Sequence, residues 1–443
     1  MISTLLVVID KPTHTSKPQN ISFLTKLAGL TVLKRLILNF QFLGGENVLI
    51  LGDSDILPDL KSDLSDKRIK LDIQYTPLSE TDGIFSSLST SYILVTEPSV
   101  FERDFLKHIM TLTPGDQGTR ITVRNSHPDL MGSESHVETG FYLAPALNTP
   151  PSPQQRDTES LIPLLINTTK PLTTALGKCF YLNIKSRKDV RKGERGLLRF
   201  LRKPTDTLIS RTLNRPVSLF FTRFLMKTSV TPNFMTLVTL VISLLSMWLV
   251  IQVADGWHGY FYGALAGILF HLASVVDGCD GEIARLKFQF SQTGEFLDGL
   301  VDDLKNGLFF GAVGYRCYLS LQGTNDYWAN IYLYTALTGL GLFFIAKTIQ
   351  YYQILTGDSE SRDIFNYTYF FEEEDHEENP GGFSRVMLFF RDFARSDFLG
   401  LMAMIGGLLN IYLYGYWVFL GFLLGIFFSV LAQTIIGRKK KPL

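Results

Sequence analysis

The spacing of apolar residues changes along the chain, from short runs in the first part to long runs in the last part. The N-terminal run in MISTLLVVID is too short for a signal sequence and has no basic residue before it, so it predicts a buried strand. A helical pattern follows over residues 22–45, closed by Gly44 and Gly45, and NVLILGD predicts a second strand. This order indicates a βαβ unit. With the strand candidates KLDIQY, YILVT and TGFYLAP, it predicts a soluble α/β domain over residues 1–180.

Residues 185–227 interleave 13 Lys or Arg and three acids with Leu, Ile and Phe. A helix with an apolar face and a cationic rim is typical of a segment that lies on an anionic membrane surface. An ordinary solvated helix is the alternative, but a hydrophobic run begins directly afterwards. We therefore expect a basic amphipathic juxtamembrane segment over residues 181–230.

Six apolar runs follow, each near the ~20 residues that a helix needs to cross the hydrocarbon core. They lie at 234–253, 259–276, 296–321, 327–347, 397–414 and 415–436. The short breaks ADGWHG, QGTNDYW and IYLYGY contain no Lys or Arg, whereas the basic segment, the two longer links and the tail RKKK do. This pattern predicts an integral membrane protein with an all-α domain of six transmembrane helices over residues 231–443. Both termini are expected in the cytoplasm, and a bacterial source would place the chain in the inner membrane.

Composition and charge agree with a membrane part. Of the 443 residues, 46% are hydrophobic and 34 are Phe. Lys plus Arg and Asp plus Glu are both 42, so net charge gives no argument for a nucleic-acid partner. Cys179, Cys279 and Cys317 are too few and too scattered for a disulfide framework or a Cys-based zinc site, and they indicate a reducing compartment. The acidic run FEEEDHEENPGG is expected to be a solvated, disordered block rather than a metal buffer.

The stretch DGCDGEIARLKFQFSQTGEFLDGLVDD concentrates acids between two apolar runs, where each charge is costly. Asp277 and Asp280 are three residues apart, and Asp298 and Asp302 are four apart, so each pair shares one helix face. Asp303 is turned by about 100° from Asp302. Two helices could therefore gather four carboxylates at the cytoplasmic membrane edge, where cations must neutralise them. An all-oxygen ligand set favours Mg²⁺ or Mn²⁺, and two such ions suit an in-line phosphoryl displacement.

Small and cationic residues accompany these acids. Gly278 and Gly281 leave out side chains beside the carboxylates, which would let a nucleotide approach the helix backbone. Arg285 adds a cationic fork for phosphate oxygens or for one of the carboxylates. Phosphate chemistry is the function that this combination favours.

The same stretch resembles the complete signature of the CDP-alcohol phosphotransferase family, D-x-x-D-G-x-x-A-R-x8-G-x-x-x-D-x-x-x-D, and no position departs from it. The resemblance covers this motif and the six-span layout, over residues 195–440, and NRPVSLFFTRFLMKTSVTPNFMT is also similar to the family's surface helix. It implies transfer of a substituted phosphate from a CDP-alcohol to an acceptor alcohol, with release of CMP, in phospholipid or polyol-phosphodiester biosynthesis. The two substrates and membrane lipids are the implied partners, and the resemblance leaves open whether the chain forms a homodimer.

The resemblance also implies roles for individual residues. Two Mg²⁺ or Mn²⁺ ions would be held by Asp277, Asp280, Asp298 and Asp302. Asp302 would also act as general base on the acceptor hydroxyl. The cytidine diphosphate would be bound by Gly281, Ala284, Arg285 and Gly294. Arg391 and Arg395, which with Asp397 precede the fifth apolar run, are candidates for binding an acceptor phosphate, although the positive-inside rule also explains the arginines.

The first domain is similar to the sugar-nucleotide transferase-like nucleotidyltransferases in LAGLTVLKRLILNFQFLGGENVLILGD and ETGFYLAP. Members that transfer a nucleotide hold its phosphates with a Gly-rich loop after the first strand, whereas DKPTHTSKPQN contains no glycine. Where those members place a metal-binding Asp, this chain has VTEPSVF. We therefore expect a Rossmann-like domain that is non-catalytic.

Several alternatives stay open. The fused layout resembles two-part enzymes that make and use CDP-inositol, so a CDP-polyol donor and a bifunctional enzyme stand beside the CDP-diacylglycerol donor of most family members. A divalent-cation transporter would also carry acids in a membrane, but those acids are expected near the middle of the spans. An inactive scaffold is the third alternative, and the intact signature argues against it.

Overall fold

The computed structural model describes residues 2–9, 22–80, 88–114, 118–124, 129, 136–146, 165, 172–202, 209–253, 256–355 and 396–440. The chain divides into two compact units. The first comprises Met1–Arg202 and Leu286–Phe288, and the second comprises Lys203–Arg285 and Gln289–Leu443. The acidic run FEEEDHEENPGG lies outside the described residues.

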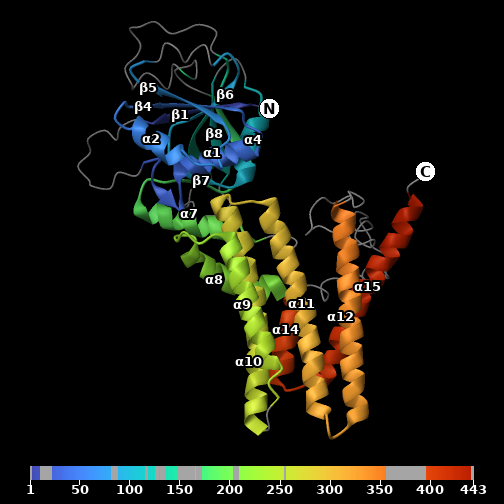
Figure 1. The fold of residues 1–443 in the computed structure, drawn as a ribbon. Helices are drawn as coiled ribbons and strands as arrows, with labels where there is room; N and C mark the ends of the chain where they lie inside the picture. The colour runs from blue at the N-terminus through green and yellow to red at the C-terminus, as the bar shows by residue number, and fades with distance from the viewer. Residues whose placement is uncertain are drawn as a thin grey trace. The chain divides into compact units, whose positions relative to one another are not determined.

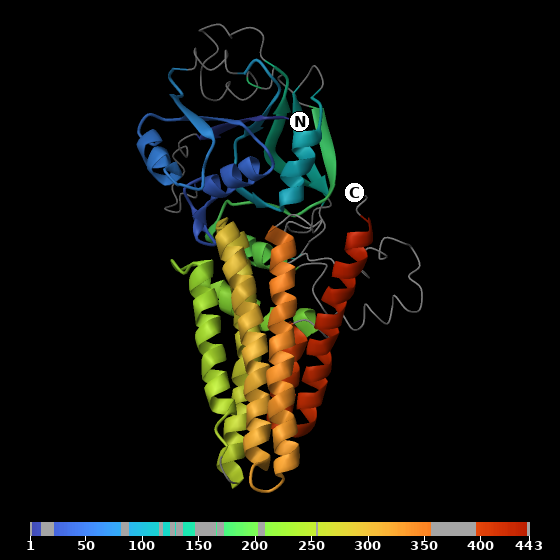
Figure 2. The same ribbon diagram turned by 45° about the vertical axis from the view of Figure 1, so that its right-hand side comes forward.

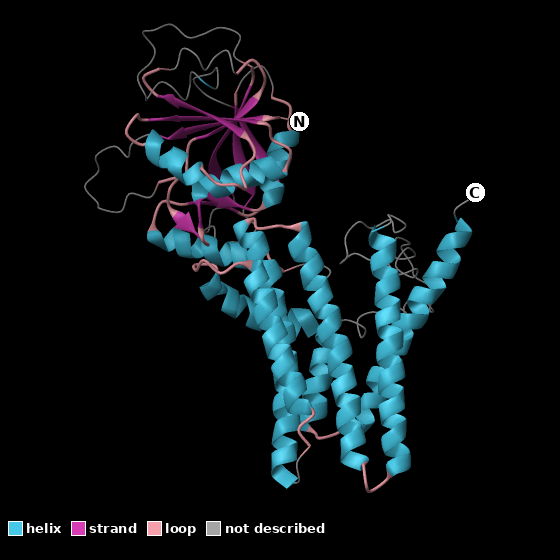
Figure 3. Ribbon diagram, viewed as in Figure 1, coloured by secondary structure: helices cyan, strands magenta, loops and turns pink. Residues whose placement is uncertain are grey.

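The first unit is built on a seven-stranded sheet in the order β10-β8-β9-β6-β1-β4-β5 (Figure 3). The strands are β1 (Thr4–Ile9), β4 (Asn47–Gly52), β5 (Asp72–Pro77), β6 (Tyr92–Val95), β8 (Thr119–Arg124), β9 (His136–Ala144) and β10 (Leu172–Lys178). Strand β1 pairs in parallel with β4 and β6, and β4 with β5, while β9 is antiparallel to both β6 and β8. The prediction of an α/β domain is confirmed, and each predicted strand overlaps an observed one. Strands β8 and β10 were not predicted.

Alternating side chains of β1, an interior strand of the sheet, enter two different cores, as the two-residue period of a strand requires. Leu5 and Val7 of β1 pack with three helices on one face, namely α1 (Val32–Phe42), α2 (Leu57–Leu64) and α4 (Arg103–Thr111). Leu6 and Val8 belong to a separate core on the other face. Burying each such side chain contributes about 1.5–3 kcal/mol, so both faces of β1 stabilise the first unit.

The helix predicted from residue 22 begins ten residues later, and this prediction is corrected. Lys26–Leu27 (β2) and Leu30–Thr31 (β3) pair as a short antiparallel hairpin. Ala28 and Gly29 between them have φ angles of 51° and 82°. Positive φ at both central residues is the geometry of a type I′ hairpin turn, and a helix excludes it. The apolar spacing continued through the hairpin and therefore suggested helix where there is none.

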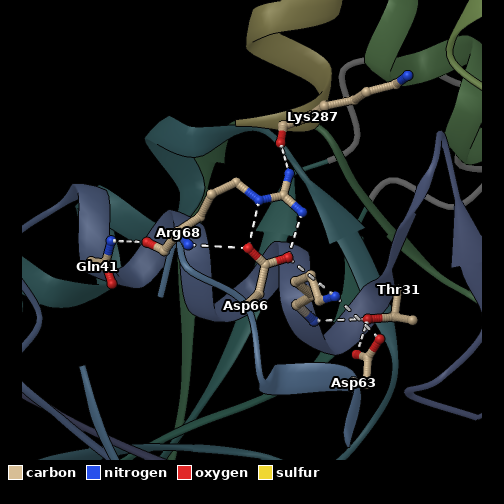
Figure 4. A network of polar contacts seen from close by, with 7 residues as sticks. Thr31, Gln41, Asp63, Asp66, Arg68 and Lys287 are labelled. Atoms are coloured by element: carbon tan, nitrogen blue, oxygen red, sulfur yellow. Dashed lines mark hydrogen bonds and ion pairs between the residues drawn. The ribbon is translucent and has the colours of Figure 1, made fainter. Parts of the chain in front are cut away.

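A polar network fixes the start of α1. The Thr31 hydroxyl accepts a hydrogen bond from the Lys34 backbone N–H at 3.2 Å and donates one to Asp63 at 2.5 Å. Lys34 Nζ lies 3.4 Å from carboxylate oxygens of both Asp63 and Asp66. Figure 4 shows the Asp66 carboxylate facing the Arg68 guanidinium, with Nε to Oδ1 at 2.8 Å. These hydrogen bonds from Arg68 hold the pKa of Asp66 well below its usual range.

The first unit extends past the predicted boundary at residue 180. Strand β11 (Tyr181–Asn183) pairs antiparallel with β7 (Ser99–Phe101), and helix α7 (Arg187–Arg199) follows. A Cβ atom at Gly193 would lie 2.9 Å from side-chain carbons of Leu27 and Val100, so α7 packs closely on the α/β domain. The basic segment expected over 181–230 is therefore two separate parts, divided at Arg202.

The second unit is helical, as Figures 1 and 2 show. Its helices are η3 (Ser210–Asn214, a π-helix), α8 (Arg215–Leu225), α9 (Pro232–Val250), α10 (Gly256–Lys287), α11 (Gln292–Leu321), α12 (Asp326–Leu355), α14 (Ser396–Leu408) and α15 (Tyr412–Lys440). Each of the six predicted apolar runs overlaps one of the last six helices. In the described part of the chain, three helical segments are long and apolar enough to cross a membrane: Pro232–Val250, Gly256–Lys287 and Asp326–Gln353. Asp397–Leu408 and Tyr412–Phe428 are shorter apolar segments.

Helix α8 has its polar face toward the protein and its apolar face outward. Ser218 and Thr222 are at most 1% exposed, whereas Phe220 and Phe224 are 58% and 59% exposed. In water this arrangement would be unfavourable, because large apolar side chains are normally buried. The distribution fits the amphipathic surface helix expected in this segment.

Two sets of close contacts fix the first half of α10. A Cβ atom at Gly267 would lie 2.3 Å from the Ala403 carbonyl oxygen, so α10 and α14 meet backbone to backbone. The buried Arg316 donates hydrogen bonds to the carbonyls of Val250 and Gly259 at 2.9 Å and of Gln252 at 3.3 Å. Arg316 thereby satisfies carbonyl groups at and just after the end of α9, and it also contacts the first turn of α10.

Candidate active site

The four aspartates of the signature come together at one end of α10 and α11. The side chains of Asp280 and Asp298 lie close enough to interact, although they belong to different helices. Asp280 Oδ2 also accepts a hydrogen bond of 3.0 Å from Thr236 Oγ1 on α9. Asp298 Oδ1 is buried without a hydrogen-bond partner among the described residues. An oxygen left in this state is a ready ligand for a cation.

Lys305 joins the other two aspartates of the set. Its Nζ lies 3.1 Å from Asp277 Oδ1 and also forms an ion pair with Asp302, three residues earlier on α11. The Lys305 side chain is 1% exposed, against 21% for Asp277 and 27% for Asp302. Sequence reasoning missed Lys305, although its spacing from Asp298 and Asp302 puts it on their helix face.

Asp303 faces away from this set, toward α12. Its carboxylate oxygens lie 2.9 Å from Lys347 Nζ and 2.8 Å from the donating Tyr351 hydroxyl. The helical repeat therefore separates two consecutive aspartates into two different ionic clusters. Asp302 is in the first cluster and Asp303 is in the second.

Glu282 lies inside the signature at a variable position and is fully buried. It accepts hydrogen bonds from three side chains of α8: Arg215 at 2.8 Å, Ser218 at 2.7 Å and Thr222 at 2.6 Å. These donors follow the helical spacing of one face of α8. Glu282 thus attaches the surface helix to α10. Sequence reasoning missed this contact because the four residues are far apart along the chain.

The glycines of the signature differ in their surroundings. A Cβ atom at Gly281 would meet no atom within 4 Å, so this side of α10 is open. A Cβ atom at Gly294, in the first turn of α11, would lie 2.9 Å from Asn233 Oδ1. Gly278 faces α8, with Ser218 Cβ 3.7 Å from the position of its missing Cβ, so it does not provide the open side expected for a nucleotide. Ala284 and Arg285 are partly exposed on α10 beyond Gly281.

The candidate acceptor residues are only partly described. Arg391 and Arg395 lie outside the described residues. Asp397, at the start of α14, accepts hydrogen bonds from Asn214 at 2.6 Å and from Ser274 at 3.3 Å. Ser274 is one turn before Asp277 on α10, so this contact connects α14 and η3 to the helix of the signature.

The carboxylate set suits hard divalent cations in its chemistry. All donors are oxygens from Asp277, Asp280, Asp298 and Asp302, and the buried Asp298 Oδ1 has no other partner among the described residues. Within that part of the chain, no three Asp, Glu, His or Cys side chains are already arranged as a metal site. Lys305 explains this for Asp277 and Asp302, because its ammonium group lies between their carboxylates.

Of the two stretches of the first unit that depart from the nucleotidyltransferase pattern, the structure describes only the second. The glycine-free stretch DKPTHTSKPQN after β1 lies outside the described residues. Glu97, which follows β6, lies 3.8 Å from Lys185 Nζ and against Gly140, where a Cβ atom would be 2.6 Å from Glu97 Cβ.

Comparison with known proteins defines the class of the second unit. Residues 229–356 match the CDP-alcohol phosphatidyltransferase family, so this part of the chain is a domain of that phosphotransferase family. The aspartate set and Lys305 lie within the match.

Three curated relatives are each named "Bifunctional IPC transferase and DIPP synthase". The protein of Archaeoglobus fulgidus is 28% identical over 44% of this chain and 39% of its own length. The proteins of Thermococcus kodakarensis and Aquifex aeolicus are both 23% identical, over 66% of this chain and 71% of their own lengths. The match to the Archaeoglobus protein thus spans well under two thirds of that relative.

Two solved structures align with 44% of the chain. HddC from Yersinia pseudotuberculosis is 13% identical with a TM-score of 0.33, and 99% of it is covered. The inositol-1-phosphate CTP transferase from T. maritima is 12% identical with a TM-score of 0.29, and 97% of it is covered.

Proposed function

We propose that the chain transfers a substituted phosphate group from a CDP-alcohol to the hydroxyl of an acceptor alcohol and releases CMP. The observation that carries this proposal is the convergence of Asp277, Asp280, Asp298 and Asp302 within a domain of the CDP-alcohol phosphatidyltransferase family. A set of four carboxylates at the end of apolar helices is costly unless it binds cations. Mg²⁺ or Mn²⁺, as two ions, is the proposed cofactor.

Each residue of the site then has a chemical task. Asp277, Asp280, Asp298 and Asp302 hold the ions, whose charge would stabilise the phosphate oxygens and the leaving CMP. Asp302 takes the proton of the acceptor hydroxyl as the new oxygen–phosphorus bond forms and the bond to the CMP oxygen breaks. Its partly exposed carboxylate suits this task, because an acceptor must reach it.

The open side of α10 is the proposed site of the cytidine diphosphate. Gly281 leaves space there, and Ala284 and Arg285 follow along the helix. Arg285 would bind phosphate oxygens through its guanidinium. Gly294 would let the start of α11 approach the nucleotide closely. Arg391 and Arg395 remain the proposed acceptor-binding residues.

The proposed setting is a membrane, with six spans formed by α9, α10, α11, α12, α14 and α15 and with both termini in the cytoplasm. Three of these helices support it by length and composition. Helix α11 carries five charged residues in its first half, which include Asp298, Asp302 and Lys305, and this lowers its apolar character. The outward phenylalanines of α8 support an adjacent lipid surface.

The donor is proposed to be CDP-diacylglycerol or a CDP-polyol. The names of the three relatives favour a second candidate, an enzyme whose first domain also makes the CDP-alcohol. The absence of glycine from the stretch after β1 argues against that second activity.

The test uses the purified full-length protein in detergent or lipid nanodiscs with Mg²⁺. CDP-diacylglycerol or CDP-inositol is supplied with a panel of alcohols, and CMP and the new phosphodiester are measured by mass spectrometry. We expect CMP release with one donor and one class of acceptor. Addition of CTP with a polyol phosphate tests the bifunctional candidate through pyrophosphate release. Metal flux into vesicles without CMP release from any donor would contradict the proposal and favour a transporter.

A further inference from the structure

Lys305 occupies a position that the signature does not assign. It lies three residues after Asp302 on α11, one turn farther from the α10–α11 connection. Its ammonium group pairs with Asp302 on its own helix and with Asp277 on α10. Lys305 is therefore an ionic connection between the two helices that carry the signature.

A buried lysine of this kind requires negative partners. With 1% of the side chain exposed, an unpaired ammonium group would be strongly unfavourable. Both partners of Lys305 belong to the proposed ligand set, and both keep an exposed side at 21% and 27%. A cation can therefore approach the carboxylates from the solvent side while Lys305 contacts them from the protein side.

We infer that Lys305 is an internal counter-cation that holds Asp277 and Asp302 in place without metal and competes with divalent cations for their oxygens. This inference rests on the proposed metal-dependent function. Lys305 is a positioning residue, because it acts on the carboxylates and not on the reacting atoms. When a metal ion binds, Asp277 and Asp302 lose part of their ion pairing with Lys305. This loss limits the metal affinity of the site.

Electrostatics gives this inference a definite sign. Removing one positive charge near the ions strengthens cation binding, because opposite charges a few ångströms apart interact strongly where water is scarce. The same change leaves the carboxylates without their buried partner and weakens the metal-free fold. A residue that only filled space would weaken the fold but would not tighten metal binding.

Thermal unfolding of the full-length protein measures both effects. The four tryptophans, Trp248, Trp257, Trp328 and Trp417, all lie in the second unit, so their fluorescence follows the unit that contains Lys305. Protein stripped with a chelator is titrated with Mn²⁺, and the Mn²⁺ concentration that gives half of the rise in Tm is recorded. For Lys305→Met and Lys305→Gln, we expect the metal-free Tm to fall by about 5–10 °C. The Mn²⁺ concentration that gives half of the rise in Tm, called the Mn²⁺ midpoint, should fall by roughly tenfold or more.

Lys347→Met is the matched control. It also removes a lysine from an ion pair with an aspartate, although this lysine is 19% exposed and its partner Asp303 is outside the ligand set. It should lower the metal-free Tm and leave the Mn²⁺ midpoint within about twofold of wild type. A midpoint that is unchanged or higher in both Lys305 variants, with wild type responding to Mn²⁺, would overturn the role of Lys305. Absence of any Mn²⁺ or Mg²⁺ response in wild type would instead contradict the proposed metal site itself.

Discussion

Arg215 Nη1 and Glu282 Oε1 lie 2.8 Å apart, and this ion pair connects the surface helix α8 to the helix that carries Asp277 and Asp280. Glu282 is fully buried and the Arg215 side chain is 11% exposed. The pair is therefore well shielded from water, and Ser218 and Thr222 satisfy the rest of the carboxylate.

Replacing Arg215 with Ala should destabilise the second unit by about 3–5 kcal/mol, because Glu282 loses its cation while it stays buried. Tryptophan fluorescence during thermal unfolding measures the loss. Arg223→Ala on the same helix removes an exposed arginine and should change stability by less than about 0.5 kcal/mol. Equal effects of the two substitutions would show that the Glu282 contact is not what attaches α8.

Asp302→Asn should reduce CMP release by roughly 100-fold or more, because the amide cannot accept the acceptor proton. Asp303→Asn changes the adjacent residue on the other helix face, where Lys347 and Tyr351 are its partners. We expect Asp303→Asn to retain activity within about tenfold at a temperature where it stays folded. Full activity of Asp302→Asn would refute the base assignment.

Acid should weaken the first unit through Asp66. Its pKa is lowered mainly by hydrogen bonds from Arg68, so its stabilising contribution is complete above the ordinary carboxyl pKa near 3.8. That contribution is lost as the pH falls below this value, because the protonated acid no longer pairs with Arg68.

The Tm difference between wild type and Asp66→Asn should therefore stay constant from about pH 7 to 5 and shrink as the pH falls below the ordinary carboxyl pKa near 3.8, as circular dichroism can measure. Asp59→Asn removes an exposed carboxylate of α2 and should give a small difference throughout. A constant gap for Asp66→Asn at all pH values would contradict the role of the Arg68 pair.

Gly267→Ala should destabilise the second unit by about 1–3 kcal/mol, because the new methyl group would lie 2.3 Å from the Ala403 carbonyl oxygen. Gly341→Ala in α12 is the control, since a Cβ atom there meets nothing within 4 Å. That variant should be neutral or gain up to about 1 kcal/mol from helix propensity. A neutral Gly267→Ala would mean that α10 and α14 can separate at this crossing.

The sequence allowed good prediction where one local pattern decides the structure. The short apolar run of β1 predicted a buried strand, and the three- and four-residue spacings of the aspartates placed each pair on one helix face. The turn at Ala28 and Gly29 was missed because the apolar spacing around it also fits a helix. Strand β8, TRITVR, was missed because its polar residues become strand through pairing with β9 and β10.

The partners inside the site were harder to predict than its signature. Lys305 follows Asp302 closely, but its contact with Asp277 depends on how α10 and α11 pack. Glu282 meets residues more than 55 positions earlier, so only the tertiary fold reveals that its charge is compensated. A single sequence shows which charges are present but not which of them pair.

Arg316 has a consequence for substrate exchange. It fixes the carbonyls of Val250, Gln252 and Gly259 at the end of α10 opposite Asp277 and Asp280. Substrate exchange at that end would require α11 to separate from α9 and α10 and would leave a buried guanidinium without its acceptors, which is unfavourable. We therefore expect a bulky donor to reach the aspartates without passing Arg316.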